Sequence, residues 1–170
     1  MLTLRPADLD DIEQEYLFVK GITADENGYI NEWPDISREA FNDALDIMIS
    51  QSKEKSLPEG YVPATYYFLR DNDTIVGQFH FRHYLCDSLI TGAGHIGYYI
   101  APQFRGRGFA SAGLKLLIDT VSDMIPEDEF YLRVNTNNPA SLKVMLKNGG
   151  YIHHEDSQHY FVRIPKEKCK

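Results

Sequence analysis

The residues best suited to chemistry form a short glycine- and arginine-rich segment, Arg105-Gly106-Arg107-Gly108-Phe109-Ala110. It lies between an apolar, strand-like run at residues 94–100 and an amphipathic stretch that extends to about Asp123. A glycine-rich turn that leads into a helix directs backbone N–H groups and the positive end of the helix dipole toward one point. The two arginines add positive charge that does not titrate at physiological pH. The segment therefore predicts a binding site for a phosphate or pyrophosphate group.

The hydrophobic pattern around this segment predicts seven strands and four helices. The strand candidates are residues 2–4, 65–69, 74–84, 94–100, 130–134, 151–154 and 159–164. Apolar residues recur every three to four positions in three helix candidates, residues 8–19, 37–49 and 110–125. A fourth, short helix begins at Asn138-Pro139, with the asparagine as its cap, and ends at Asn148-Gly149-Gly150. Residues 28–34 predict a loop and residues 87–93 a turn.

The order of these elements, β-α-α-β-β-β-α-β-α-β-β, predicts an α+β fold. It favours a mainly antiparallel sheet with one parallel pair, made by the strands on either side of helix 110–125. A doubly wound dinucleotide-binding domain would instead begin with its glycine loop and repeat βα units. Because the glycine-rich segment follows several antiparallel strands here, that fold is excluded.

Composition narrows the class of protein. The chain has 170 residues, 43% hydrophobic and 25% charged, which predicts a single globular domain over residues 1–170. A formal net charge of −8 argues against a nucleic-acid partner, and it fits either simple solubility or attraction of a cationic amine. We expect no membrane association, because the sequence has neither a signal-peptide pattern nor an apolar run of about 20 residues. Cys86 and Cys169 are too few for a metal site or a disulfide framework, so we expect no metal and a cytoplasmic location.

Two segments together resemble the GNAT superfamily of N-acetyltransferases. The signature of that family is Gln or Arg, two residues, Gly, one residue, and Gly or Ala, which Arg105, Gly108 and Ala110 match. The second segment runs from Asn137-Asn138-Pro139-Ala140-Ser141 to Gly149-Gly150-Tyr151. The similarity extends from Leu2 to Ile164. The run His95-Ile96-Gly97-Tyr98, followed by Pro102, also resembles a bacterial branch described only as predicted acetyltransferases.

The resemblance implies a three-layer fold: a central, mostly antiparallel, twisted sheet of about seven strands with a parallel pair of the fourth and fifth strands, flanked by about four helices. It also implies acetyl-CoA as co-substrate. The backbone of residues 105–110 would hold its pyrophosphate, and the strand edge at Tyr99, Ile100 and Ala101 would pair with its pantetheine amides. Asn138 would contact the pantetheine or acyl region, cap its helix, or do both. The implied cofactor-binding residues are Ile100, Ala101, Arg105, Gly106, Arg107, Gly108, Phe109, Ala110, Asn138 and Ser141.

The implied reaction is direct transfer of an acetyl group to a primary amine of a small molecule or a peptide. It needs a base for the ammonium and a donor for the oxyanion, for which a strand N–H near Tyr99 or Ile100 is the candidate. The sequence departs from the family at both usual acid–base positions, because Leu146 stands where many members have tyrosine and His95 where many have a carboxylate. His95 is interpreted either as the base or as a histidine hydrogen-bonded within the sheet. Tyr98, Tyr99 and Tyr160 are the candidates to substitute for the missing tyrosine as the acid, and Tyr99 is the one predicted to be catalytic.

These departures leave a second function open, an acyl-CoA-binding or regulatory module that has lost catalysis. The burial of His95 distinguishes the two, because a base needs an open path to the thioester. Residues 21–34 and the last hairpin would shape the acceptor pocket, where Glu26, Glu32 and Asp35 are available to attract an amine. Edge strands in the last hairpin also make a homodimer a candidate assembly.

Overall fold

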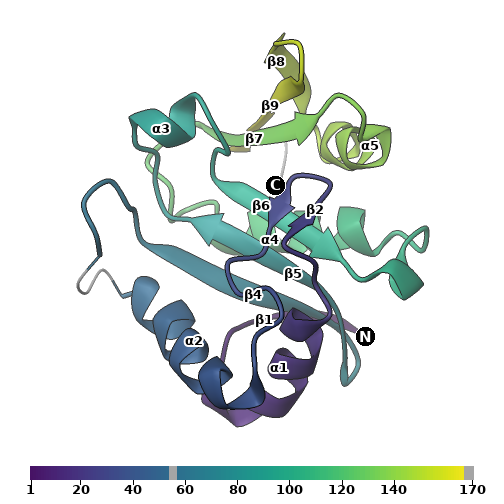
Figure 1. Cartoon of the computed structure of the whole chain (residues 1–170). Coiled ribbons are helices and arrows are strands. Elements are labelled where there is room, and N and C mark those ends of the chain that lie inside the picture. Colours follow the sequence, from purple (N-terminus) through teal and green to yellow (C-terminus); the bar gives the residue numbers. More distant parts are fainter. Residues whose placement is uncertain (54–56, 167–170) are drawn as a thin grey trace.

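Two antiparallel sheets form the framework of the protein, which the computed structural model describes over residues 1–53 and 57–166. The larger sheet has the order β1-β4-β5-β6, with strands Leu2–Pro6, Ala64–Asp71, Thr74–Arg82 and Ile96–Ile100. The smaller sheet has the order β7-β9-β8, with strands Glu129–Asn135, His159–Pro165 and Tyr151–Glu155. A separate hairpin pairs β2 (Asp25–Glu26) with β3 (Tyr29–Ile30) (Figure 1).

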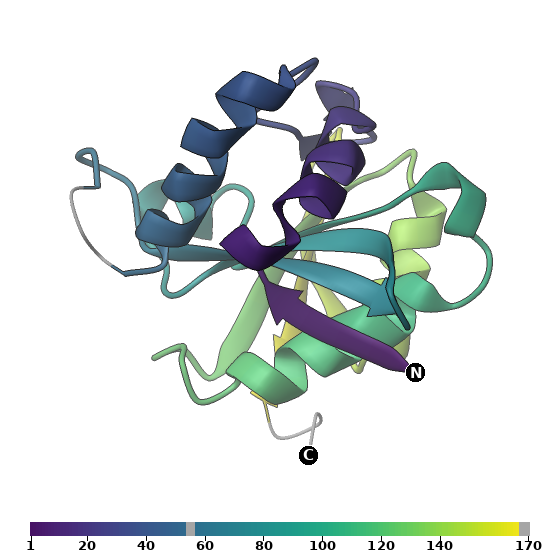
Figure 2. The same cartoon turned by 90° about the horizontal axis from the view of Figure 1, so that it is seen from below.

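Helices cover both faces of the larger sheet and complete three layers. Helices α1 (Ile12–Lys20) and α2 (Arg38–Gln51) lie on one face, and α4 (Phe109–Val121) lies on the other (Figure 2). Helix α5 (Pro139–Lys147) packs beside α4, and α3 (Asp87–Ile90) is a single turn. Two 3-10 turns, Leu9–Asp11 and Pro102–Phe104, precede α1 and α4. The architecture confirms the predicted α+β class.

Local signals in the sequence set where the helices begin. The Ser37 side chain accepts a hydrogen bond from the Ala40 N–H at the start of α2, and Asn138 accepts one from the Ser141 N–H at the start of α5. Asp8 does the same for the turn that precedes α1, through the N–H of Asp10. Each bond satisfies a donor that the first helical turn leaves without a partner. The cap predicted at Asn138 is confirmed.

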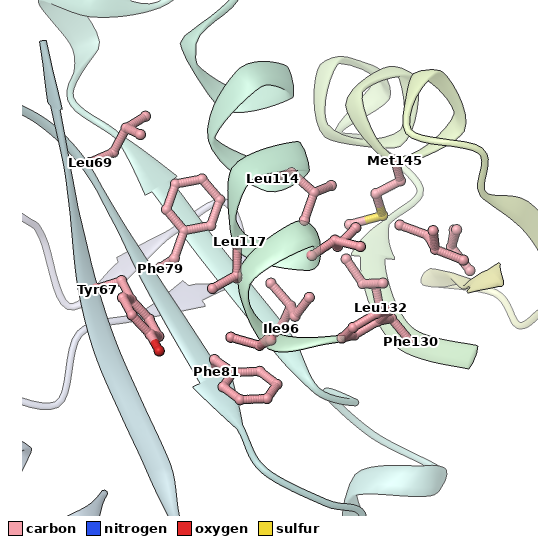
Figure 3. Packing of buried hydrophobic residues seen from close by; sticks show 14 of the residues in the cluster. Tyr67, Leu69, Phe79, Phe81, Ile96, Leu114, Leu117, Phe130, Leu132 and Met145 are labelled. Atoms are coloured by element: carbon pink, nitrogen blue, oxygen red, sulfur yellow. The ribbon is translucent and has the colours of Figure 1, made fainter. Parts of the chain in front are cut away.

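Alternation along β5 divides its side chains between two chemical environments. Phe79 and Phe81 enter the large core between the sheet, α4 and the smaller sheet (Figure 3). Helix α4 packs closely there, because a Cβ on Gly113 would lie only 2.6 Å from Cζ of Phe79. Gln78 is buried too, but it belongs to none of the three hydrophobic clusters. The close packing of α4 fixes the position of the glycine-rich segment that leads into it.

The predicted parallel pair is corrected by the structure. Strands β6 and β7 run in a similar direction in Figure 1, yet every hydrogen-bonded ladder among the described residues is antiparallel. The two strands meet only just before β6, where Gly94 makes an isolated antiparallel bridge to Leu132 and the His95 N–H donates to the Tyr131 carbonyl at 2.7 Å. Beyond that point the two sheets diverge, so no ladder joins them.

Two further segments differ from the predictions. Residues 28–34 were expected to form a loop, but β3 lies within them and pairs with β2 through a tight turn at Asn27-Gly28. Both turn residues have positive φ, 53° and 92°, as the turn of a two-residue hairpin requires. The expected turn at residues 87–93 contains the single-turn helix α3. The four predicted helices correspond to α1, α2, α4 and α5.

Other expectations concern membrane spans and metals. In residues 1–53 and 57–166, no helix combines the length and apolar character that crossing a bilayer requires. In the same residues, no cluster of three or more His, Cys, Asp or Glu side chains is arranged to hold a metal ion. Cys86 is a free thiol, and Cys169 lies outside the described residues.

Candidate functional site

A cavity of about 730 Å³ lies where the two sheets diverge. Its walls come from the β2–β3 hairpin, from β6, from residues 104–106 and 108–111, from the end of β7, from α5 with its N-cap, and from the start of β9. Both flanking strands therefore contribute residues to the cavity wall, β6 from the larger sheet and β7 from the smaller one. The cavity brings together segments that are up to about 130 residues apart in sequence, from Asp25 to His159.

The glycine-rich segment forms the wall at the start of α4. Gly106 and Gly108 have φ values of 76° and 82°, in the left-handed region that favours glycine. A Cβ at either position would meet nothing within 4 Å, so the backbone conformation, and not lack of room, requires glycine here. Gly108 is the N-cap of α4 and has no side-chain cap. The N–H groups of residues 106–111 donate no hydrogen bond to another described residue, so they remain available to an anion.

The two arginines of the segment behave differently. Arg105 donates from Nε to the Ile100 carbonyl at 2.9 Å and from Nη2 to Oε1 of Glu26 at 2.9 Å, and its guanidinium lies 5.6 Å from the centre of the Tyr99 ring. Arg107 instead lies over the Phe109 ring, 4.9 Å from its centre. Arg105 lines the cavity, whereas Arg107 is not part of its wall.

Most of the predicted cofactor-binding residues meet at this cavity. Those on its wall are Ile100, Arg105, Gly106, Gly108, Phe109, Ala110, Asn138 and Ser141. Ala101, like Arg107, is outside the wall; it is buried beside Ile22 and Tyr99. The two segments that the sequence analysis assigned to the cofactor, residues 100–110 and 138–141, therefore line the same cavity although they are distant in sequence.

Tyr98 joins β6 to the start of α5. Its hydroxyl lies 2.7 Å from Oγ of Ser141 and donates to the Ser141 carbonyl at 3.1 Å. Burial raises the pKa of Tyr98 to about 12, so the hydroxyl keeps its proton at neutral pH. Because this hydroxyl is already bonded within the protein, Tyr98 is a structural link and a weaker candidate for proton transfer than Tyr99.

Tyr99 lines the cavity from the opposite face of β6. Its ring lies 5.9 Å from the rings of both Phe18 and Tyr29. Burial raises the pKa of Tyr99, the carboxylate of Glu26 raises it further, and Arg105 opposes both. The phenol is therefore protonated at neutral pH and lies beside the only charged pair that links the hairpin to the glycine-rich segment among the described residues.

The structure places His95 within the framework and outside the cavity wall. Its side chain is 0% exposed. Nδ1 accepts the Tyr131 N–H at 2.9 Å, so the neutral ring carries its hydrogen on Nε2, which lies 3.0 Å from Oε2 of Glu127. Burial lowers the pKa of His95, although the bond to Glu127 works in the opposite direction. Of the two interpretations offered by the sequence, the geometry matches the histidine bonded within the sheet.

The β2–β3 hairpin supplies contacts that the sequence did not predict. The hydroxyl of Tyr29 donates to Oε1 of Gln78 at 2.7 Å, and a Cβ on Gly97 would lie 3.7 Å from the Tyr29 ring. The hairpin is thus held against β5 and β6. Glu26 is on the cavity wall, while the other two proposed amine-attracting residues, Glu32 and Asp35, are not. The dipeptide Asn27-Gly28 is typical of a two-residue hairpin turn and could have indicated this hairpin. The flanking strands, however, have only two residues each, too few to show the alternation of a strand.

Comparison with known proteins gives one family match. A model of the acetyltransferase (GNAT) domain matches residues 1–150. No curated relative matches the sequence.

Solved structures show the same fold at low sequence identity. The ribosomal-protein α-N-acetyltransferase RimL, in complex with coenzyme A, is 21% identical with a TM-score of 0.66, covering 95% of this chain and 90% of RimL. A spermidine N-acetyltransferase chimera from Vibrio cholerae and hSSAT is 16% identical with a TM-score of 0.64, covering 99% and 97%. A microcin self-immunity acetyltransferase, in complex with acetyl-CoA and AMP, is 17% identical with a TM-score of 0.65, covering 96% and 92%.

Proposed function

The chain belongs to the GNAT family of acetyltransferases, and we propose that it uses acetyl-CoA to acetylate a primary amine of a small molecule or a peptide by direct transfer. One observation carries the proposal: six consecutive N–H groups without partners among the described residues, 106–111, lie at the start of α4. Segments of the same stretch form part of the wall of a cavity of about 730 Å³. Backbone donors at a helix N-terminus suit a pyrophosphate, and the solved relatives include complexes with coenzyme A and acetyl-CoA.

The residues of the cavity wall suit acetyl-CoA in two further ways. Strand β6 pairs with β5 through one edge, while its other edge faces β7 with no ladder. This edge of β6 is therefore open to the amides of an extended ligand, as it would be to an added strand, except that the Ile100 carbonyl already accepts from Nε of Arg105. Asn138 and Ser141, on the facing wall, supply polar atoms from α5. When bound, acetyl-CoA would supply an acetyl group activated as a thioester.

For the chemistry, we assign proton donation to Tyr99 and a positioning role to His95. Tyr99 keeps its proton at neutral pH and is on the cavity wall, as a group that protonates a leaving thiolate must be. His95 has both ring nitrogens bonded inside the framework, so it holds the start of β6 beside β7. Leu146, which stands at the usual tyrosine position, is exposed and off the cavity wall.

Because His95 is buried and cannot act as an exposed base, a second function is also considered, an acyl-CoA-binding module without turnover. One assay separates them: release of free coenzyme A thiol from acetyl-CoA over a panel of polyamines, aminoglycosides, amino acids and peptide N-termini. We expect at least one amine to accelerate thiol release above the amine-free rate. Binding of coenzyme A with no acceleration by any amine would favour the binding module.

Several properties stay predictions from the sequence alone. They are a single domain over residues 1–170, a cytoplasmic location in a bacterium, the lack of a nucleic-acid partner, and a homodimer. For the homodimer, the five residues of β8 are exposed and form one edge of the smaller sheet. An edge strand of this kind is a common site of pairing between copies.

A further inference from the structure

An ion pair ties the β2–β3 hairpin to the glycine-rich segment. Oε1 of Glu26 accepts from Nη2 of Arg105 at 2.9 Å, across 79 positions of sequence. Figure 1 shows the hairpin beside the end of β6, from which the glycine-rich segment follows. Both side chains lie on the cavity wall. Two elements of the cavity wall are therefore joined by an ion pair.

Glu26 is well held as a carboxylate. Its second oxygen accepts from the Thr23 hydroxyl at 2.8 Å. The bond from Arg105, followed by the bond from Thr23, holds the pKa of Glu26 below its usual value, so it is ionised at neutral pH. Arg105 in turn has Nε bonded to the Ile100 carbonyl. In this arrangement the guanidinium of Arg105 is bonded to a carboxylate of the protein. It is therefore not free to bind an anion held by the N–H groups of residues 106–111.

We propose that Glu26 is a positioning residue that competes with the phosphates of acetyl-CoA for the guanidinium of Arg105. Glu26 thereby lowers the affinity of the protein for acetyl-CoA. The inference rests on the proposed function, because it requires a phosphate at the glycine-rich segment. Of the five N–H donors of the Arg105 guanidinium, one is bonded to Ile100 and one to Glu26, so a phosphate would share a single positive charge with the Glu26 carboxylate. Glu26 also places a negative charge on the wall that receives the phosphates.

Calorimetric titration with coenzyme A at low ionic strength tests the proposal on the full chain. Five proteins are compared: wild type, Glu26→Gln, Arg105→Gln, the double variant, and Asp119→Asn. The glutamine at 26 keeps an oxygen for Thr23 but loses the charge. Asp119 pairs with Lys115 on the exposed side of α4 and is the matched control for loss of one negative charge.

We expect Glu26→Gln to bind coenzyme A about 2–5-fold more tightly than wild type, the range that a partly exposed ion pair supports. Arg105→Gln should bind more weakly, and adding Glu26→Gln to it should change the affinity little, because the competition acts through Arg105. Asp119→Asn should match wild type.

Three outcomes would overturn the proposal. Unchanged or weaker binding by Glu26→Gln would mean that Glu26 holds Arg105 ready for the phosphate. Equal tightening with and without Arg105 would mean simple repulsion through space, and equal tightening by Asp119→Asn would mean a general charge effect. Failure of the wild type to bind coenzyme A is a different result, because it rejects the proposed function itself.

Discussion

The Nε2 atom of His95 and the Oε2 atom of Glu127 lie 3.0 Å apart, and this contact secures the place where the two sheets meet. Glu127 also accepts the N–H of Leu85, so it ties the segment after β5 to the approach to β7. On the other side of the ring, His95 accepts the N–H of Tyr131 in β7. One imidazole therefore connects both sheets at the point where they meet.

Substitution of His95 should damage stability more than chemistry. His95→Ala removes both bonds and leaves a buried N–H at Tyr131 and a void, so we expect the free energy of unfolding to fall by about 2–4 kcal/mol. Denaturant unfolding measures this. Turnover per folded molecule, assayed well below the melting temperature, should keep the pH profile of the wild type. A stable variant with abolished turnover would restore His95 as a catalytic base.

Removal of the Tyr99 hydroxyl should act on the chemical step. We expect Tyr99→Phe to lower kcat by about 10²-fold, the scale of a lost general acid, with the Kd for coenzyme A within a factor of about two. Tyr160→Phe is the control, since Tyr160 was a substitute candidate and is off the cavity wall. Equal kcat values for Tyr99→Phe and wild type would exclude Tyr99 as the proton donor.

A bulky residue at position 108 should block the binding of coenzyme A and acetyl-CoA. The space around its Cβ position is open, so Gly108→Trp would place an indole over the N–H groups at the start of α4. We expect no measurable binding of coenzyme A by calorimetry. Gly60→Trp is a matched control, because Gly60 has φ 84° and equally open surroundings away from the cavity. Normal binding by Gly108→Trp, or loss of binding by both variants, would contradict the assigned site.

Glu15 gives a prediction of pH dependence. It is 1% exposed, one oxygen accepts the Asp8 N–H, and the other has no partner among the described residues. Burial raises its pKa from 4.5 to about 8. The folded state therefore binds this proton more tightly than the unfolded chain, so the contribution to stability is complete below pH 4.5 and is lost as the pH rises through 8.

Glu15→Gln should remove that dependence. At pH 7 we expect it to stabilise the protein relative to wild type by on the order of 2 kcal/mol, with the difference growing from pH 5 to pH 8. Glu155→Gln, at an exposed position of β8, should show no such trend. Parallel stability curves for Glu15→Gln and wild type over this range would show that the carboxyl is not desolvated in solution.

Local patterns predicted what depends on local structure. The cap at Asn138 and the glycine-rich turn that leads into α4 follow from residue type and near neighbours, and both were predicted correctly. The role of His95 could not be predicted in the same way. Its partner Glu127 is 32 residues away, and the contact exists only because β6 and β7 meet at that point.

The predicted parallel pair shows a second limit. A strand, a crossover helix and another strand normally predict adjacent parallel strands. Here the pairing is interrupted after Gly94 and Leu132, because the space beyond them is the cavity. Element order determines which strands are neighbours, but it does not determine the angle between them.

The divergence of β6 and β7 has a consequence for assembly of the fold. Each strand has one edge in a ladder and a second edge without one among the described residues, where Arg105 already bonds the Ile100 carbonyl and His95 bonds the peptide groups of Tyr131. An extended ligand with amide groups that entered this gap would pair with the groups still free on these edges and would link the two sheets through itself. Binding and completion of the architecture are then the same event, and the ligand is for that time a structural part of the protein.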